Sequence, residues 1–260
     1  TIRRRCGCLV GDRTAFEAMN ELLFLSLIAF VAFAYAMVGH GGASGYLALM
    51  ALAGIPLIVA RPSALMINLV VSGVAFAQYA RAGHFRWPLF WPFALASVPM
   101  AWLGARVSID PLMYKRILAV CLLLAVARLL GIFGTNDKAE QQVPLAAALV
   151  IGAVLGFVSG LISIGGGILL SPILLLMHWA DTKVTACTSA LFILVNSAAG
   201  LAGTPHLAAV IDVQLLSWVA VALCAGLAGA YIGARRLQPP RLRQALGVVL
   251  LFACVKLWWP

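Results

Sequence analysis

The sequence SIGGG at 163–167 lies near the middle of residues 141–180, an interval that contains no Asp, Glu, Lys or Arg. A similar sequence, GHGGASG at 39–45, lies in the middle of the equally uncharged interval 22–60. As a single helix, either interval would be about 60 Å long at 1.5 Å per residue, whereas a bilayer core is about 30 Å thick. Because consecutive glycines disfavour a helix, each interval is predicted to form two hydrophobic segments separated by a break.

The composition indicates a membrane protein. Of the 260 residues, 63% are hydrophobic and only 10% are charged, against about 25% charged residues in an average soluble domain. A surface with so few charges needs lipid as its solvent. The 18 Lys and Arg residues exceed the 8 Asp and Glu residues, but they lie almost wholly between apolar runs, as in loops at an anionic membrane face. We therefore expect a multi-pass protein in the lipid bilayer of the inner (plasma) membrane, with a cytoplasmic N-terminus and no nucleic-acid partner.

The apolar runs predict an all-α integral membrane protein of two homologous repeats, each with about five hydrophobic segments, and with glycine-broken helices at the repeat interface. Outside the two broken intervals, the runs are 62–80, 87–105, 117–134, 184–204, 213–234 and 244–259. The predicted organisation is a basic N-terminal segment, a first transmembrane repeat, a polar linker and a second transmembrane repeat, at 1–16, 17–133, 134–142 and 143–260.

Matching landmarks in the two halves favour the repeat. The glycine pair at 41–42 corresponds to 165–166 at an offset of 124, and Ser-Ala-Leu at 63–65 corresponds to 189–191 at an offset of 126. Two such halves can enclose a site that neither encloses alone. An odd number of crossings per half would make the repeats inverted, and an even number would make them parallel. The distribution of basic loops leaves both arrangements open.

The glycine clusters are the predicted binding site. A break at membrane depth leaves backbone N–H groups without partners, and the N–H groups that open the next helix form a site for an anion. The residues that we expect to contribute are Gly41, Gly42, Ala43, Ser44, Ser163, Gly165, Gly166 and Gly167. Close helix packing is the alternative reason for glycines in a transmembrane run.

Polar residues in the following runs are candidates for the rest of the site. Ser63 and Ser189 correspond between the halves, and Asn68 and Asn196 follow them, with Thr188 nearby. We expect these side chains to line the path of the anion. The alternative is that the asparagines only form hydrogen bonds with a neighbouring helix.

Titratable and basic residues beside these runs have two interpretations. His40 adjoins the first glycine pair and is a candidate for proton coupling, with a structural hydrogen bond as the alternative. Arg106 and Arg235 end matching runs, where they either attract or gate the anion or extend to the lipid headgroups. Arg61 and Lys183 follow the short broken segments and have the same two interpretations.

The sequence predicts neither an enzyme nor a bound metal or cofactor. It contains no HExxH motif and no nucleophile–histidine–acid arrangement, and Cys6 and Cys8 lack a second pair of ligands at zinc spacing. It also lacks a Walker motif, which favours secondary transport over ATP-driven transport.

The same glycine-rich residues carry a family resemblance. GFVSGLISIGGGILLSPILLLM at 156–177, followed by ACTSALFIL at 186–194, resembles the second-repeat signature of the TauE/SafE family of sulfite exporters. GHGGASGYLALMALAGIP at 39–56 and PSALMIN at 62–68 match the first repeat more loosely, because His40 replaces a small or apolar residue and Ala43 replaces a third glycine. The resemblance implies export of sulfite, of sulfonates such as sulfoacetate, or of other sulfur compounds.

The expected function is export of a small sulfur oxyanion by alternating access, with the anion as the only ligand. A passive anion channel with the same site is the main alternative. A membrane-embedded enzyme and a non-transporting assembly subunit are further alternatives. The sequence leaves open whether the chain forms a homodimer.

Overall fold

The computed structural model describes residues 21–129, 141–204 and 211–236, and every regular element in these ranges is an α-helix. The helices are α2 (Glu21–Met37), α3 (Ala43–Leu52), α4 (Leu57–Arg81), α5 (Trp87–Arg106), α6 (Pro111–Leu129), α7 (Leu145–Ile162), α8 (Gly167–Leu176), α9 (Thr182–Gly203) and α10 (Val213–Arg235). This confirms the predicted all-α fold. The N-terminal segment 1–16, most of the linker 134–142 and the last run 244–259 lie outside the described residues.

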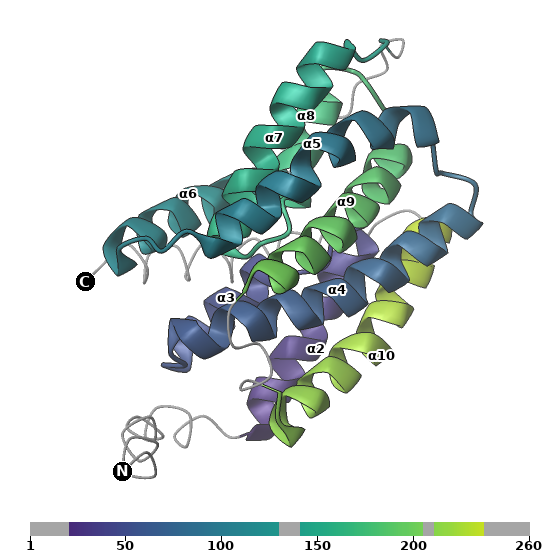
Figure 1. Cartoon of the computed structure of the whole chain (residues 1–260). Coiled ribbons are helices and arrows are strands. Elements are labelled where there is room, and N and C mark those ends of the chain that lie inside the picture. Colours follow the sequence, from purple (N-terminus) through teal and green to yellow (C-terminus); the bar gives the residue numbers. More distant parts are fainter. Residues whose placement is uncertain (1–20, 130–140, 205–210, 237–260) are drawn as a thin grey trace.

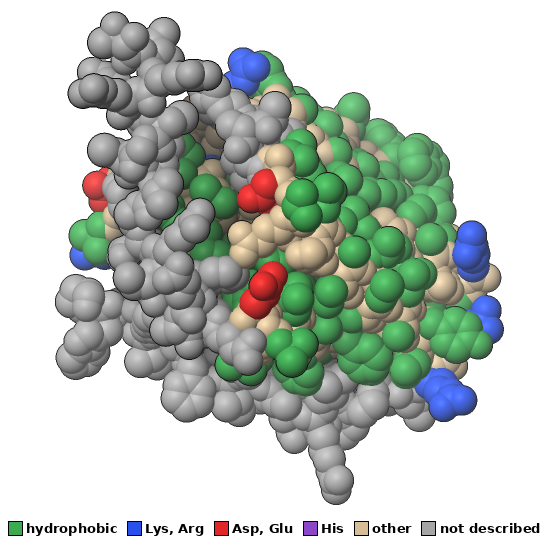
Figure 2. Space-filling model, turned by 90° about the horizontal axis from the view of Figure 1, so that it is seen from below, with side chains coloured by type: hydrophobic (Ala, Val, Ile, Leu, Met, Phe, Trp, Pro, Cys, Tyr) green, Lys and Arg blue, Asp and Glu red, His purple; other side chains and the backbone are tan. Residues whose placement is uncertain are grey.

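Five of the described helices, α4, α5, α7, α9 and α10, are long and apolar enough to cross a membrane, while α2, α3 and α8 are shorter apolar helices. The outer face in Figure 2 is largely hydrophobic, with Lys and Arg side chains near its edges. Such a surface suits a protein whose sides contact lipid and whose ends contact water.

Both uncharged intervals are broken where the glycines predicted it. In the first interval, α2 ends at Met37, and α3 begins after Gly42, whose φ is 95°. In the second, α7 ends before Ser163, with a φ of 60°, and α8 begins after Gly166, with a φ of 75°. Glycine adopts positive φ without the steric cost that other residues incur, so the glycine clusters allow the chain to leave one helix and begin the next.

Two helix pairs flank a central pair. Figure 1 shows α4 and α9 between α2 with α10 on one side and α5 with α7 on the other, and the contacts between these helices agree. Along α4 and α9, Leu65 lies against Gly200, and Gly73 lies against Leu194. Later residues of α4 therefore contact earlier residues of α9, so these two helices are antiparallel. If the two halves are a repeat, which stays a prediction, this direction makes it an inverted one.

Glycines bring the flanking helices into backbone contact. Gly156 and Gly160 of α7 lie against the carbonyl groups of Ser97 and Ala101 on α5. On the other side, Gly233 of α10 lies against the carbonyl of Met37 on α2 in the same way. Close approach through small residues is a main source of helix association in lipid, where no hydrophobic driving force acts between helices.

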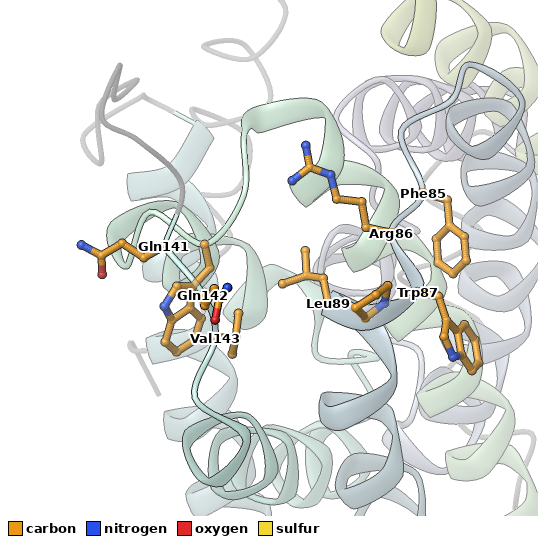
Figure 3. Close-up of a pocket in the computed structure, with 9 residues that line it drawn as sticks. Phe85, Arg86, Trp87, Leu89, Gln141, Gln142 and Val143 are labelled. Carbon is orange, nitrogen blue, oxygen red and sulfur yellow. The ribbon is translucent and has the colours of Figure 1, made fainter.

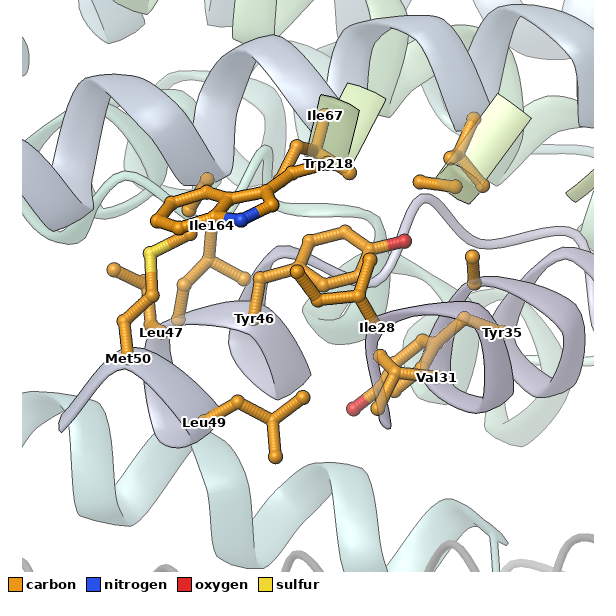
Figure 4. Close-up of a cluster of buried hydrophobic side chains, with 14 of the residues drawn as sticks. Ile28, Val31, Tyr35, Tyr46, Leu47, Leu49, Met50, Ile67, Ile164 and Trp218 are labelled. Atoms are coloured by element: carbon orange, nitrogen blue, oxygen red, sulfur yellow. The ribbon is translucent and has the colours of Figure 1, made fainter. Parts of the chain in front are cut away.

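The short helix α3 is buried by its neighbours. Figure 4 shows Tyr46 and Met50 of α3 among Ile28 of α2, Ile67 of α4 and Trp218 of α10. All five side chains are buried, and they belong to one hydrophobic cluster. This packing holds the start of α3, and with it the first glycine break, at a defined place inside the bundle.

The glycine contact between α5 and α7 predicts a specific loss of stability. In Gly160→Ala, the added methyl group would meet the backbone of Ala101 and Ala105, so one helix must move. Overpacking of this kind costs about 1–3 kcal/mol. We expect a lower midpoint of thermal unfolding in detergent. The matched control is Gly73→Ala, whose methyl group would find Leu194 at an ordinary 3.5 Å. Equal midpoints for the two variants would contradict the packing described above.

Candidate functional site

The first turns of α3 and α8 meet the middle of the central helix pair. Ala43, the first residue of α3, contacts Asn68 near the middle of the 25-residue helix α4. Gly167, the first residue of α8, lies against Ser189 and Ile193 of α9. A helix N-terminus has backbone N–H groups without intrahelical acceptors and the positive end of the helix dipole. The structure therefore places two such termini inside the bundle.

Asn68 connects the two breaks. Its Oδ1 accepts a hydrogen bond of 3.0 Å from the Ala43 N–H, and its Nδ2 donates to the Ile164 carbonyl at 3.3 Å and to Ser197 Oγ at 2.8 Å. The side chain is fully buried, and Gly41 and Gly165 both lie directly against it. A Cβ at Gly41 would overlap the Asn68 side chain, so glycine is required there for close approach.

His40 connects the first break with α8 and α9. Its Nδ1 lies 2.9 Å from the Val38 carbonyl, its Nε2 lies 3.0 Å from Ser171 Oγ, and Ser171 Oγ lies 2.7 Å from Ser189 Oγ. A carbonyl only accepts, so Nδ1 carries the proton in the neutral ring, and Nε2 accepts from Ser171. Ser189 then donates to Ser171. Protonation of His40 would reverse the bond between His40 and Ser171, because Nε2 would then donate, and it would free the Ser171 proton to point elsewhere, for example toward Ser189.

Several buried polar groups of α3, α4, α7 and α9 have no hydrogen-bond partner within the described residues. They are Tyr46 Oη, Ser63 Oγ, Ser159 Oγ, Thr185 Oγ1, Thr188 Oγ1 and Asn196 Oδ1. Tyr46 Oη lies beside Gly42, and Ser159 Oγ lies beside Gly166, so each glycine that precedes a helix start faces one of these hydroxyls. A buried unpaired polar group costs about 1–3 kcal/mol, and its presence calls for an explanation.

The groups around the breaks are closed off from the exterior in this conformation. Every residue of 34–50, 159–168 and 184–190 is buried. Ser44 is paired with Tyr35, its Oγ lying 2.8 Å from the tyrosine Oη. A ligand can therefore reach these groups only when the surrounding helices separate.

The other predicted site residues divide into those at the breaks and those away from them. Ser163 lies at the second break and accepts a hydrogen bond of 3.1 Å from Arg61 Nε. Arg106 and Arg235 are exposed helix-end residues that stack on their own helices, Arg106 over Trp102 and Arg235 over Tyr231. Both side chains are exposed, although the helix ends that carry them pack near the breaks, with Gly104 against Leu161 and Gly233 against Met37.

Sequence reasoning missed three serines. Ser159 lies four residues before Ser163, and Ser171 lies four residues after Gly167, which is the spacing at which residues of one helix share a face. Ser197 accepts from Asn68 Nδ2 and adjoins the predicted Asn196. The helical spacing was the available signal for the first two. Among the described residues, no three His, Cys, Asp or Glu side chains come together as a metal site would require.

A separate pocket of about 740 Å³ lies at one end of the bundle. Figure 3 shows its lining from the α4–α5 loop and the start of α5, including Phe85, Arg86 and Trp87, and from the segment before α7, including Gln141 and Gln142. None of the residues of either glycine break lines it. This pocket is therefore distinct from the buried site between the breaks.

Comparison with known proteins places the chain in a family. A family model described as "Sulfite exporter TauE/SafE" matches residues 24–257, which includes both breaks. The chain belongs to the TauE/SafE family. This confirms the resemblance drawn from the glycine-rich motifs, and it makes the chain a multi-pass membrane protein of a transporter family.

Two relatives of this TauE/SafE chain are named as probable membrane transporters. A protein of Sinorhizobium fredii (strain NBRC 101917 / NGR234), named "Probable membrane transporter protein y4hK", is 36% identical over 245 residues, which cover 92% of this chain and 99% of that protein. "Probable membrane transporter protein ORF9" of Sinorhizobium sp is 30% identical over 154 residues, covering 58% of this chain and 59% of that protein. No solved structure matches the chain.

The two asparagines of the site should differ in their effect on stability. Asn68→Leu leaves the Ala43 N–H and the Ile164 carbonyl without their hydrogen bonds, at about 1–3 kcal/mol for each buried group. Among the described residues, Asn196→Leu removes only one bond, to the Phe192 carbonyl of its own helix, together with an oxygen that has no partner there. We expect the first variant to lower the thermal midpoint in detergent clearly more than the second. The reverse order would contradict the bridging role of Asn68.

Proposed function

We propose that this chain exports a small sulfur oxyanion, sulfite or a short organosulfonate, by alternating access. The observation that carries the proposal is the pair of helix N-termini inside the bundle, each beside a buried hydroxyl that has no partner among the described residues. Backbone N–H groups around Gly41–Ser44 and Ser163–Gly167 would hold the anion. Those of Ala43, Ser163, Ile164 and Gly167 already donate hydrogen bonds within the protein, so the groups available in the closed state are on the other residues of the two breaks. The polar side chains that would complete its shell are Ser63, Asn68, Ser159, Thr188, Ser189 and Asn196.

The chemistry of the site favours an anion that must also be released. The positive ends of two helix dipoles stabilise negative charge, and hydroxyl groups donate hydrogen bonds to oxyanions. Neither α3 nor α8 contains a charged residue, and α9 contains none after Lys183. Neutral donors hold a dianion less tightly than a buried Lys or Arg would, so release to the other side remains feasible. The family's description, sulfite exporter, supports sulfur oxyanions as the cargo.

A carrier is favoured over a passive channel because the site is closed from the exterior, as alternating access requires at one stage of the cycle. We further propose that His40 carries the coupled proton, since its protonation would reverse its hydrogen bond with Ser171, which in turn contacts Ser189. Counterflow in proteoliposomes separates the two mechanisms, because only a carrier shows trans-stimulation. If His40 carries the proton, His40→Gln keeps sulfite exchange but loses uphill export driven by a proton gradient.

Because these hydroxyls have no partner among the described residues, removing one should weaken anion binding without lowering the stability of the ligand-free protein. Thr188→Val removes a buried hydroxyl without a partner among the described residues, so the ligand-free protein should be equally stable or more stable. If that hydroxyl donates to the anion, the same variant should lose most of the rise in thermal midpoint that sulfite produces. The measurement is thermal unfolding in detergent with sulfite, sulfate, sulfoacetate, taurine or chloride at equal ionic strength.

The matched control is Ser26→Ala, which removes an exposed hydroxyl bonded to the Leu22 carbonyl on α2. This variant should keep the full sulfite-induced rise. A rise with sulfite and none with chloride supports the proposal. No rise with any of the anions, or a full rise in Thr188→Val, counts against the site as proposed.

A further inference from the structure

Arg61 lies at the start of α4 and reaches across to the second break. Its Nε donates to Ser163 Oγ at 3.1 Å, and its Nη2 donates to the Leu161 carbonyl at 2.9 Å. The guanidinium also lies over the ring of Tyr114, 5.5 Å from the ring centre. The arginine is half-buried, whereas Arg106 and Arg235 are exposed.

The charge of Arg61 is not neutralised within the described residues. No Asp or Glu of the described chain forms an ion pair with it, and its hydrogen-bond acceptors are a hydroxyl and a carbonyl. A guanidinium has five N–H donors, and two of them are used here. A cation inside a membrane protein is costly without a counter-ion, and such a residue marks an ion pathway or a substrate site by default.

A purely structural role explains only part of this geometry. Arg61 and Tyr114 cap the end of α7, because Arg61 binds the Leu161 carbonyl and the Tyr114 hydroxyl donates to the Ile162 carbonyl at 3.1 Å. A cation at a helix C-terminus is favourable. The neutral Tyr114 performs the same capping, however, so capping alone does not require a charge. The bond to Ser163 is also not a cap of this kind, since it ends on a side chain of the break itself.

We propose that Arg61 is a latch that admits anions to the second break from the end of the bundle where α4 begins. In the closed state it holds Ser163. When the path opens, the guanidinium releases Ser163 and pairs with the oxyanion on its way to or from the N-terminus of α8. That the transported molecule is an anion is taken from the function proposed above. Lys183 of α9 makes a comparable contact at the other end of the bundle, where its Nζ donates to the Ala234 carbonyl at 3.2 Å.

The test measures charge selection at two thiols, one placed behind the latch at position 159 and the other at the residue that Arg61 holds, position 163. Ser159→Cys and, separately, Ser163→Cys are made in a chain whose six native cysteines are replaced by alanine. Each thiol is treated with two methanethiosulfonate reagents of similar size, one carrying a sulfonate and the other a trimethylammonium group. The thiolate attacks the thiosulfonate sulfur, forms a disulfide and releases methanesulfinate. The ratio of the two rates cancels differences in thiol reactivity and in overall opening.

With Arg61 present, the anionic reagent should react faster, and Arg61→Gln should lower the ratio about tenfold, the lower end of the range for electrostatic attraction into a cleft. Arg61→Lys should keep most of the preference, because it keeps the charge. The matched control is Arg81→Gln, which removes an exposed arginine at the other end of α4 and should leave the ratio unchanged.

An unchanged ratio in Arg61→Gln overturns the latch, and so does an equal fall in Arg81→Gln. Failure of both thiols to react with either reagent also overturns it, because the path past Arg61 would then not open. The readout uses no sulfite. If Arg61→Gln leaves the ratio unchanged while sulfite still stabilises the protein, only the latch is rejected. If Arg61→Gln lowers the ratio but sulfite does not stabilise the protein, only the proposed cargo is rejected.

Discussion

A helix that stops inside a membrane must find partners for its backbone polar groups, and this constraint organises the centre of the protein. Asn68 meets part of the demand at both breaks at once, because one carboxamide binds an N–H group after the first break and a carbonyl group within the second. The glycines on either side leave room for that side chain. The two breaks are therefore joined through a single residue of the central helix α4.

The surrounding helices hold this polar centre in place by close packing. Contacts through glycine bring α7 onto α5 and α10 onto α2, and apolar side chains enclose α3. Within this closely packed frame, the buried hydroxyls of Ser159 and Thr188 have no hydrogen-bond partner in the described chain. Unpaired polar groups weaken the fold, and binding sites are where proteins retain them. The frame supplies the stability, and the unpaired groups supply the capacity to bind.

Much of the fold could be predicted because local chemistry determines it. The length of the uncharged intervals and the glycines at 41–42 and 165–166 predicted two broken helices, since no intact helix of that length fits a bilayer. The direction of the halves could not be predicted from charge, because basic residues lie at both ends of the runs. The antiparallel contact of α4 and α9 depends on tertiary packing.

The position of the candidate site at the two breaks could be predicted from the sequence, but the contacts of its side chains could be predicted less well. Asn68 was identified as polar and buried, but its reach to Ile164, 96 positions away, depends on how the halves pack. Arg61, Arg106 and Arg235 look alike in sequence, each near the end of an apolar run. Only the packed structure separates the half-buried Arg61 at the second break from the two exposed arginines.

Binding of an oxyanion by backbone N–H groups at the two breaks can be tested directly with selenite. Selenite has the pyramidal shape of sulfite and, when fully deprotonated, the same charge, and its selenium can be located by anomalous X-ray scattering in a crystal of the protein. The account predicts a selenium peak between the first turns of α3 and α8, within hydrogen-bonding distance of backbone N–H groups near Gly42 and Gly166. A peak only at the pocket beside Trp87, or only at exposed arginines, would contradict it.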